Sequence, residues 1–133
     1  WLDARRLIAH LNREGLPGVT FEPIHYQSCR GLYAGTDLDG IKIVVSDYAS
    51  FHPVTTCILI LDGIQRLYGG ERLWSAPGTR PEWFDKLFGT DQVRLALLEG
   101  QDWRGISRPW VTENAAFHRA REACLLYGKG GAP

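Results

Sequence analysis

The sequence contains no methionine and only three cysteines, Cys29, Cys57 and Cys124. Their number is odd and their spacings match neither a disulfide framework nor a zinc ribbon, which argues against a fold held together by disulfides or by a structural metal. Cys57 and Cys124 lie among apolar residues at helical spacing, where a free thiol packs like a small hydrophobic group. We therefore expect these two thiols in the core.

The sequence also lacks a long apolar run and an excess of either charge. The longest apolar run, residues 57–61, is far shorter than the roughly 20 residues that cross a bilayer, which excludes membrane insertion. Fifteen basic residues balance 15 acidic ones, and no basic cluster alternates with aromatic residues, so nucleic acid is not an expected partner. No GxGxxG or GxxxxGK motif is present, so no nucleotide cofactor is expected.

Hydrophobic periodicity predicts an α+β fold, a helix-rich single domain in which a small β-sheet is covered by helices. Strands are expected over residues 19–26 and 41–48, with a long loop at 27–38 and a turn at Asp37–Gly40. Helices are expected between Asp3 and Gly15, from Pro53 to Gly69, over 81–88 and over 91–99. A short turn is expected near 102–106, and a last helix carries Phe117, Ala120, Cys124 and Tyr127. The tail at 128–133 is expected to be frayed. We treat residues 1–133 as one domain, and the start at Trp1 without methionine suggests a cut between domains of a longer protein.

The charged segment FDKLFGTDQVR, residues 84–94, is interpreted as a joint between two helices. Gly89 is a natural helix stop, and Thr90 is placed to cap the next helix. The apolar residues Phe84, Leu87 and Phe88 are expected to point inward. Asp91 and Arg94, three residues apart on one helix, are expected to pair.

Asp47 and His52 are the most suggestive pair for chemistry, since an acid at a strand end is followed closely by a histidine at a helix start. The alternative is that Asp47 accepts turn hydrogen bonds and His52 merely precedes Pro53. A glycosidase needs two carboxylates about 5–10 Å apart, and no convincing pair is found in this sequence. We therefore assign no catalytic residue.

The long loop offers a second group of candidates. His25 and Cys29 could form half of a metal site or a thiolate with its base, but no further ligands occur at a recognisable spacing, so no metal is assigned. Arg30, Tyr33 and His25 together present a polar and aromatic surface that could hold a sugar or a carboxylate by stacking and charge-assisted hydrogen bonds. An exposed turn is the alternative.

Several fragments, in this order, point to a known family: WLDARRL, GLPGVTFEPIHY, YAG followed by IKIVVSD, FHPV, FDKLFGTDQVRLALLEG and FHRAREACLLY. The chain resembles the C-terminal domain of bacterial exo-β-N-acetylmuramidases of the NamZ type, a family formerly classed as of unknown function. The resemblance covers nearly the whole chain.

The resemblance implies a two-domain glycosidase that removes N-acetylmuramic acid from the non-reducing ends of peptidoglycan fragments. The catalytic carboxylate would lie in an upstream Rossmann-like domain, and this chain would be an accessory domain that helps to form the inter-domain cleft. An extracytoplasmic location in bacteria is also implied. On this basis the candidate substrate-binding residues for the peptidoglycan-derived sugar are His25, Arg30, Tyr33, Asp47 and His52.

Two positions differ from the family's usual pattern. The loop that usually reads TPTFSKYAG reads QSCRGLYAG here, which leaves Arg30 as the nearest cation. Where the family tends to have an arginine before the helix-starting proline, this chain has His52. If either position contacts the carboxylate of muramic acid, the substrate specificity differs in this chain.

Two other functions stay open. The chain could be a non-catalytic module that binds a cell-wall sugar or a partner protein. It could also be a small self-contained hydrolase that uses His52, Asp47 or Cys29.

Overall fold

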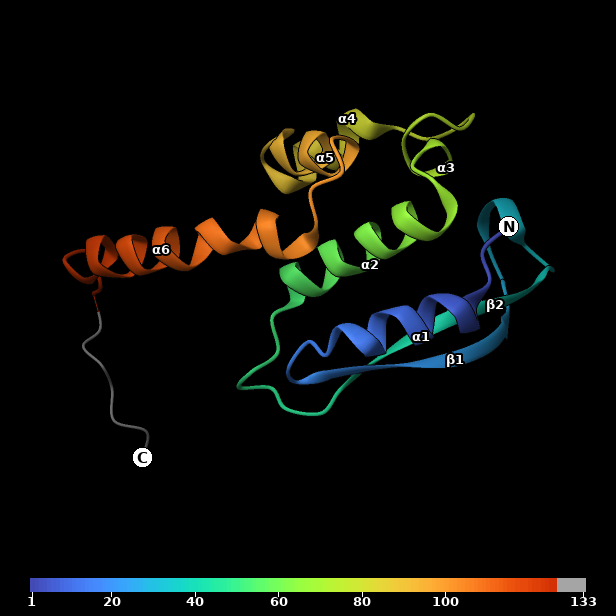
Figure 1. The fold of residues 1–133 in the computed structure, drawn as a ribbon, viewed down its shortest axis with the longest axis horizontal. Helices are drawn as coiled ribbons and strands as arrows, with labels where there is room; N and C mark the ends of the chain where they lie inside the picture. Colours follow the sequence, from blue (N-terminus) through green and yellow to red (C-terminus); the bar gives the residue numbers. More distant parts are fainter. Residues whose placement is uncertain (127–133) are drawn as a thin grey trace.

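The computed structural model describes residues 1–126 and confirms the predicted α+β class. A two-stranded ribbon lies under α1, α2 packs on α1, and the shorter helices lie beyond α2 (Figure 1). Tyr127 and the tail 128–133 lie outside the described residues. The elements are α1 (Ala4–Glu14), β1 (Val19–Gln27), the 3-10 helix η1 (Gly31–Tyr33), β2 (Asp37–Val45), α2 (Pro53–Tyr68), α3 (Glu71–Trp74), α4 (Pro81–Phe88), α5 (Gln92–Leu98) and α6 (Trp103–Glu122).

Helix α1 forms as predicted and is fixed to the ribbon by its buried face. The Asp3 side chain caps it by accepting from the Arg6 N–H, and Gly15 ends it in the left-handed region at φ 66°. Leu7 and Leu11 are almost fully buried in the main core. The core consists of Leu7, Leu11, Leu16, Val19, Phe21, Ile58, Leu59, Trp74, Val93, Leu97, Trp103 and Ile106.

The Asn12 side chain joins α1 directly to β1. Its amide nitrogen donates to the Phe21 carbonyl, and its amide oxygen accepts from the Phe21 N–H, both at 2.9 Å. Because β1 pairs with a strand on one side only, its other edge would otherwise present unpaired backbone groups. Asn12 satisfies one donor and one acceptor of that edge.

The ribbon is antiparallel, and its register pairs Val19 with Val45 at one end and Gln27 with Asp37 at the other. The predicted turn at Asp37–Gly40 is wrong, because these residues are the first part of β2. Pairing with β1 overrides the local turn propensity, and Gly40 suits its place because a Cβ there would lie 3.3 Å from the Tyr26 ring. The reversal of the chain falls instead on residues 28–36.

Helix α2 is confirmed, with Pro53 in its first turn. Ile58 and Leu59 are fully buried, and the buried carboxylate of Asp62 accepts from the Arg66 side chain and from the Trp103 N–H. The expectation of a buried Cys57 is wrong, because its place on the helix leaves it exposed.

The joint at residues 84–94 is confirmed as two helices, with Gly89 in the left-handed region between them. Two details of the prediction are wrong. Leu87 is 85% exposed, whereas Phe84 and Phe88 belong to an aromatic row that runs from Trp74 to Trp110. Arg94 pairs through two nitrogens with Asp85 on α4 rather than with Asp91, because the fold of the joint brings a better placed carboxylate to it.

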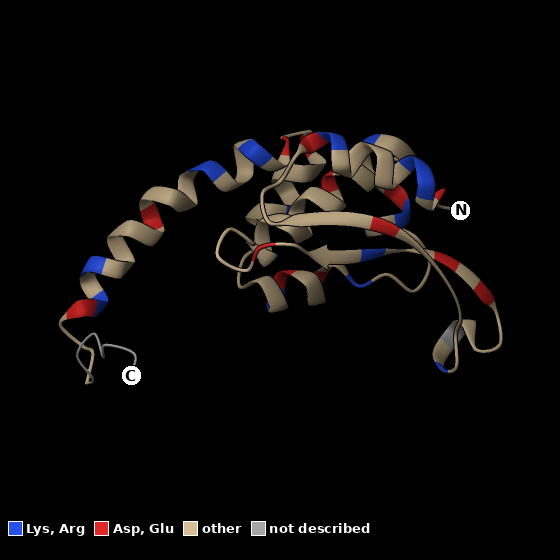
Figure 2. Ribbon diagram, turned by 90° about the horizontal axis from the view of Figure 1, so that it is seen from below, with Lys and Arg blue, Asp and Glu red and all other residues tan. Residues whose placement is uncertain are grey.

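Helix α6 starts earlier than predicted, since the turn expected near residues 102–106 is its first turn. Asp102 caps it by accepting from the Gly105 N–H at 2.7 Å. The helix continues through Pro109, and Figure 2 shows it curving away from the rest of the domain. Cys124 follows its end and is exposed, so its predicted place in the core is also wrong. None of the helices in the described part of the chain has the length and apolar character that crossing a bilayer needs.

We predict that Asn12→Ala lowers the stability of the domain by about 2 kcal/mol, because it leaves the Phe21 backbone groups without their partners. A thermal unfolding midpoint measured by circular dichroism should fall by roughly 5–10 °C. Asn114→Ala makes the same change at an exposed position of α6 and should leave the midpoint nearly unchanged. Equal midpoints for the two variants would contradict the role given to Asn12.

Candidate functional site

A groove lies where the ribbon extends past the start of α1. Its volume is about 410 Å³. An 11-residue helix is about 16 Å long, whereas a nine-residue strand is about 30 Å long, so α1 cannot cover the whole ribbon. The groove is lined by Leu2, Asp3, Ala4, Arg5, Pro23, Ile24, His25, Asp39 and Gly40.

His25 and Asp39 form the polar centre of this groove. They are directly opposite in the ribbon register, and the His25 Nδ1 lies 2.9 Å from the Asp39 Oδ1. The hydrogen bond to Asp39 raises the pKa of His25, with a smaller contribution from the charge of the same carboxylate. The pair therefore keeps the imidazole oriented and positively charged to a higher pH than a free histidine.

Arg30 and Tyr33 lie in the loop that joins the two strands, at the same end of the ribbon as His25. The loop is closed by backbone hydrogen bonds between Ser28 and Thr36 at 3.0 Å and between Gly35 and Ser28 at 2.7 Å. Arg30 is exposed and the Tyr33 ring is 54% exposed. Figure 2 shows this end of the ribbon projecting beyond the helical layer. The tip of the ribbon therefore presents a cation and an aromatic ring at the end that also carries His25.

Asp47 and His52 lie at the opposite end of the ribbon, on the connection to α2. From Asp39 to Val45 there are six residues of strand, or about 20 Å, so these two residues and His25 do not meet around one small ligand. Asp47 accepts from the Ala49 N–H at 3.0 Å and from the Ser50 hydroxyl at 2.6 Å, and the latter bond chiefly lowers its pKa. This agrees with the turn alternative for Asp47.

Gly18 explains why the connection follows this path. Its φ is +75°, and a Cβ at this position would lie 2.6 Å from the Asp47 carbonyl oxygen and 2.8 Å from the Phe51 nitrogen. Its own carbonyl accepts from the Ser46 N–H at 2.9 Å. The turn before β1 and the connection after β2 are therefore packed backbone against backbone.

The buried and half-buried carboxylates are engaged in structural bonds. Glu14 accepts from Trp103 and Arg104, and these bonds lower its pKa; Asp85 is held by Arg94 in the same way. Among residues 1–126 no group of three or more His, Cys, Asp or Glu side chains could hold a metal ion.

Two residues of this groove, Asp39 and Arg5, were not predicted from the sequence as site residues. Asp39 was interpreted as a turn residue, although placing the reversal at residues 28–36 would have put it opposite His25. Arg5 lines the groove from the first turn of α1, and no pattern within the helix indicates that it lies near the ribbon tip.

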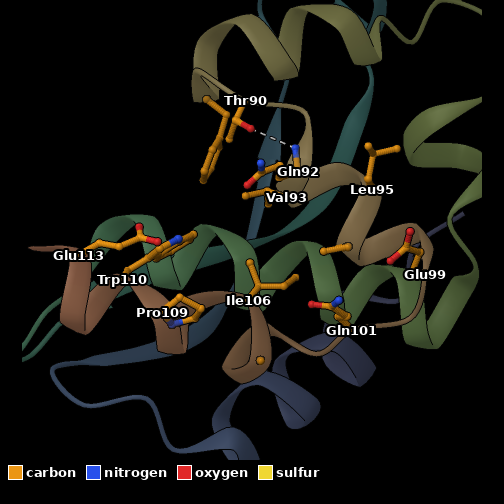
Figure 3. A pocket seen from close by; sticks show the side chains of 13 residues that line it. Thr90, Gln92, Val93, Leu95, Glu99, Gln101, Ile106, Pro109, Trp110 and Glu113 are labelled. Carbon is orange, nitrogen blue, oxygen red and sulfur yellow. Dashed lines mark hydrogen bonds between the residues drawn. The ribbon is translucent and has the colours of Figure 1, made fainter.

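A second, larger groove of about 660 Å³ lies between α5 and α6, far from the predicted site residues in the sequence. Figure 3 shows Trp110, Pro109 and Ile106 of α6 on one side and Thr90, Val93 and Leu95 on the other. Its surface is a mixture of apolar side chains and the polar groups of Gln92, Glu99, Gln101 and Glu113.

Comparisons with known proteins agree with each other. A family model described as "Exo-beta-N-acetylmuramidase NamZ, C-terminal" matches residues 1–127. The chain is 27% identical over 127 residues to the peptidoglycan beta-N-acetylmuramidase NamZ of Bacillus subtilis (strain 168), covering 96% of this chain and 30% of that protein. Its fold is similar to the crystal structure of a DUF1343 family protein from Bacteroides fragilis NCTC 9343, with a TM-score of 0.83 and 22% identity over 96% of this chain and 34% of that chain. The chain thus spans about a third of the length of each.

We predict that Asp39→Asn lowers the pKa of His25 towards the value of a free imidazole, whereas Asp37→Asn, which removes a weaker and more distant charge, lowers it less. The pair stabilises the protein while His25 is protonated, so its contribution is present below the pKa of a free imidazole and is lost as the pH rises through the raised value. An NMR titration of the imidazole signals measures both variants. A His25 pKa that Asp39→Asn leaves unchanged would show that the contact does not form in solution.

Proposed function

The chain belongs to the family of NamZ C-terminal domains, and from this membership we propose that it is the accessory domain of a longer peptidoglycan glycosidase that removes N-acetylmuramic acid from non-reducing ends. The observation that carries the proposal is the match of residues 1–127 to the family model. In addition, the chain covers only about a third of the length of each relative. An upstream Rossmann-like domain would supply the catalytic carboxylate. This role suits a chain whose buried and half-buried carboxylates are bonded to cations and backbone.

The ribbon tip is the part of this domain that we propose to face the inter-domain cleft. N-acetylmuramic acid carries a carboxylate on a lactyl group, and a cation beside an aromatic ring can hold such a sugar by a charge-assisted hydrogen bond and by stacking. Arg30, Tyr33 and the His25–Asp39 pair supply these groups at one end of the ribbon. Asp47 and His52, at the other end, would contact a different part of a longer substrate or none of it.

A non-catalytic binding module is the second candidate, and the exposure of the ribbon tip is the observation that favours it. Tyr26 and Tyr33 are 47% and 54% exposed, and Arg30 lies between them in the sequence. Such a surface could hold a cell-wall sugar without serving a reaction. For either function we propose an extracytoplasmic location, where peptidoglycan fragments occur.

The first test compares this chain alone with the longer protein in the release of a chromogenic N-acetylmuramic acid glycoside. We expect activity only in the longer protein, because the resemblance places the catalytic carboxylate in the upstream domain. Activity in the short chain would support a self-contained hydrolase that uses Asp47, His52 or Cys29. Sugar binding without activity in both forms would support the binding module.

The second test replaces Arg30 in the longer protein. Losing one charge-assisted hydrogen bond should raise KM roughly tenfold for a substrate that carries the lactyl carboxylate, and should have little effect on the N-acetylglucosamine analogue, which lacks it. Arg13→Ala removes an exposed arginine at the far end of α1 and serves as the matched control. An unchanged KM in Arg30→Ala would remove Arg30 from the site.

A further inference from the structure

The residues that lead into α1 are each fixed to the body of the domain. The Trp1 ring meets the Tyr68 ring in a T-shaped arrangement, with the ring centroids 6.1 Å apart. Leu2 packs against the main core. The Asp3 carbonyl accepts from the Tyr68 hydroxyl at 2.8 Å, and the Asp3 side chain accepts from the Arg6 N–H. The backbone therefore enters α1 along a defined path.

Two arginines complete a row of stacked groups around Trp1. The Arg72 guanidinium lies over the Trp1 ring, with its central carbon 5.4 Å from the ring centroid, and the Arg6 guanidinium lies over the Tyr68 ring at 5.7 Å. Both distances are within the range of cation–π attraction. The row joins the start of the chain to α1, to the end of α2 and to α3. We call Arg6, Tyr68, Trp1 and Arg72 the Trp1 cluster.

The Trp1 cluster holds the chain beside the smaller groove, which we call the His25 groove. Leu2 and Asp3, the residues that follow Trp1, line this groove together with His25. Figures 1 and 2 both show the start of the chain at the end of the domain that carries the ribbon tip. The residues of the Trp1 cluster thus determine how the chain arrives at the rim of the groove.

We propose that the Trp1 cluster is the anchor that holds the preceding domain of the same polypeptide against the rim of the His25 groove. This inference rests on the proposed function, which places such a domain upstream. The matched family is a C-terminal one, and the matched part is 30% of one relative and 34% of the other, so most of each relative lies outside it. Such a domain would be joined to this one at Trp1, next to Leu2 in the groove wall.

The chemistry of the Trp1 cluster suits a protein surface. Trp1 is 59% exposed, and Arg6 and Arg72 are exposed as well. Tryptophan, tyrosine and arginine are the residues that most often dominate the binding energy of protein interfaces. Within residues 1–126 neither of the two guanidinium groups forms an ion pair with a carboxylate. We therefore expect acidic side chains on the surface of the preceding domain that meets them.

An anchor at Trp1 decides which end of the ribbon faces the inter-domain cleft. A domain held there lies against His25 and Asp39, at the opposite end of the ribbon from Asp47 and His52. Trp1 is not among the residues that line the groove. It acts on the site through the preceding domain and is therefore a positioning residue.

The proposal is tested by modifying the histidines with diethylpyrocarbonate in this chain alone and in the longer protein. The His25 side chain is 67% exposed in this chain, so a domain anchored at Trp1 should slow its modification several-fold in the longer protein. His118 is exposed on the second half of α6 and should react at the same rate in both. Mass spectrometry of the digested proteins measures both rates. Equal rates for His25 in the two proteins would overturn the proposal.

Variants of the longer protein test the anchor itself. Trp1→Ala should return the modification rate of His25 close to that in this chain alone, and Arg72→Ala, which leaves both rings in place, should return it in part. Trp83→Ala is the matched control, because Trp83 is 51% exposed and has Lys86 over its ring at 5.4 Å. It should leave His25 shielded. Shielding that persists in both Trp1→Ala and Arg72→Ala would show that the anchor lies elsewhere.

The readout separates this inference from the proposed function, because it does not depend on glycosidase activity. An inactive longer protein in which His25 is shielded would contradict the proposed function and keep the anchor, and an active one with an unshielded His25 would do the reverse. Shielding of His25 in this chain alone that rises with protein concentration would also overturn the proposal, because a second copy would then be the occupant.

Discussion

The two hydrogen bonds between the Asn12 side chain and the Phe21 backbone hold together the part of the fold on which everything else is built. A two-stranded ribbon is at best marginally stable in water, and it needs a packed helix to persist. Asn12 satisfies one donor and one acceptor on the free edge of β1, while Leu7 and Leu11 cover the buried face around Val19 and Phe21. Helix α2 then packs on α1, and Asp62 on α2 accepts from the Trp103 N–H at the start of α6.

The same arrangement creates the candidate site, because one short helix covers only part of a longer ribbon. Side chains of alternate residues share a face, so the face that carries Val19 and Phe21 under the helix carries His25 beyond it. There the position is exposed, and a histidine paired with Asp39 takes the place of an apolar residue. The ribbon face thus changes from buried core to exposed groove because β1 is longer than α1, and not because of a special motif.

Much of the fold could be predicted from the sequence because local signals and tertiary packing agree there. Asp3, Gly15, Pro53 and Gly89 mark helix boundaries by their own conformational preferences, and the structure keeps all four in those roles. The errors arose where a partner distant in sequence decides the outcome. Pairing with β1 turns Asp37–Gly40 into a strand, and the joint after α4 delivers Asp85 to Arg94. The prediction of the candidate site failed for the same reason, because the pairing of His25 with Asp39 depends on strand register.

Helix α6 shows the same limit of prediction from local sequence signals. Its periodicity predicts a buried face, and a helix of 20 residues carries that face about 30 Å, but the small domain covers only the part near Trp103 and Ile106. Amphipathic periodicity indicates that one face of a helix is suited to packing, but it does not indicate which part of the molecule packs against that face. Here the apolar face and the polar ribbon tip lie at opposite ends of the domain (Figure 2).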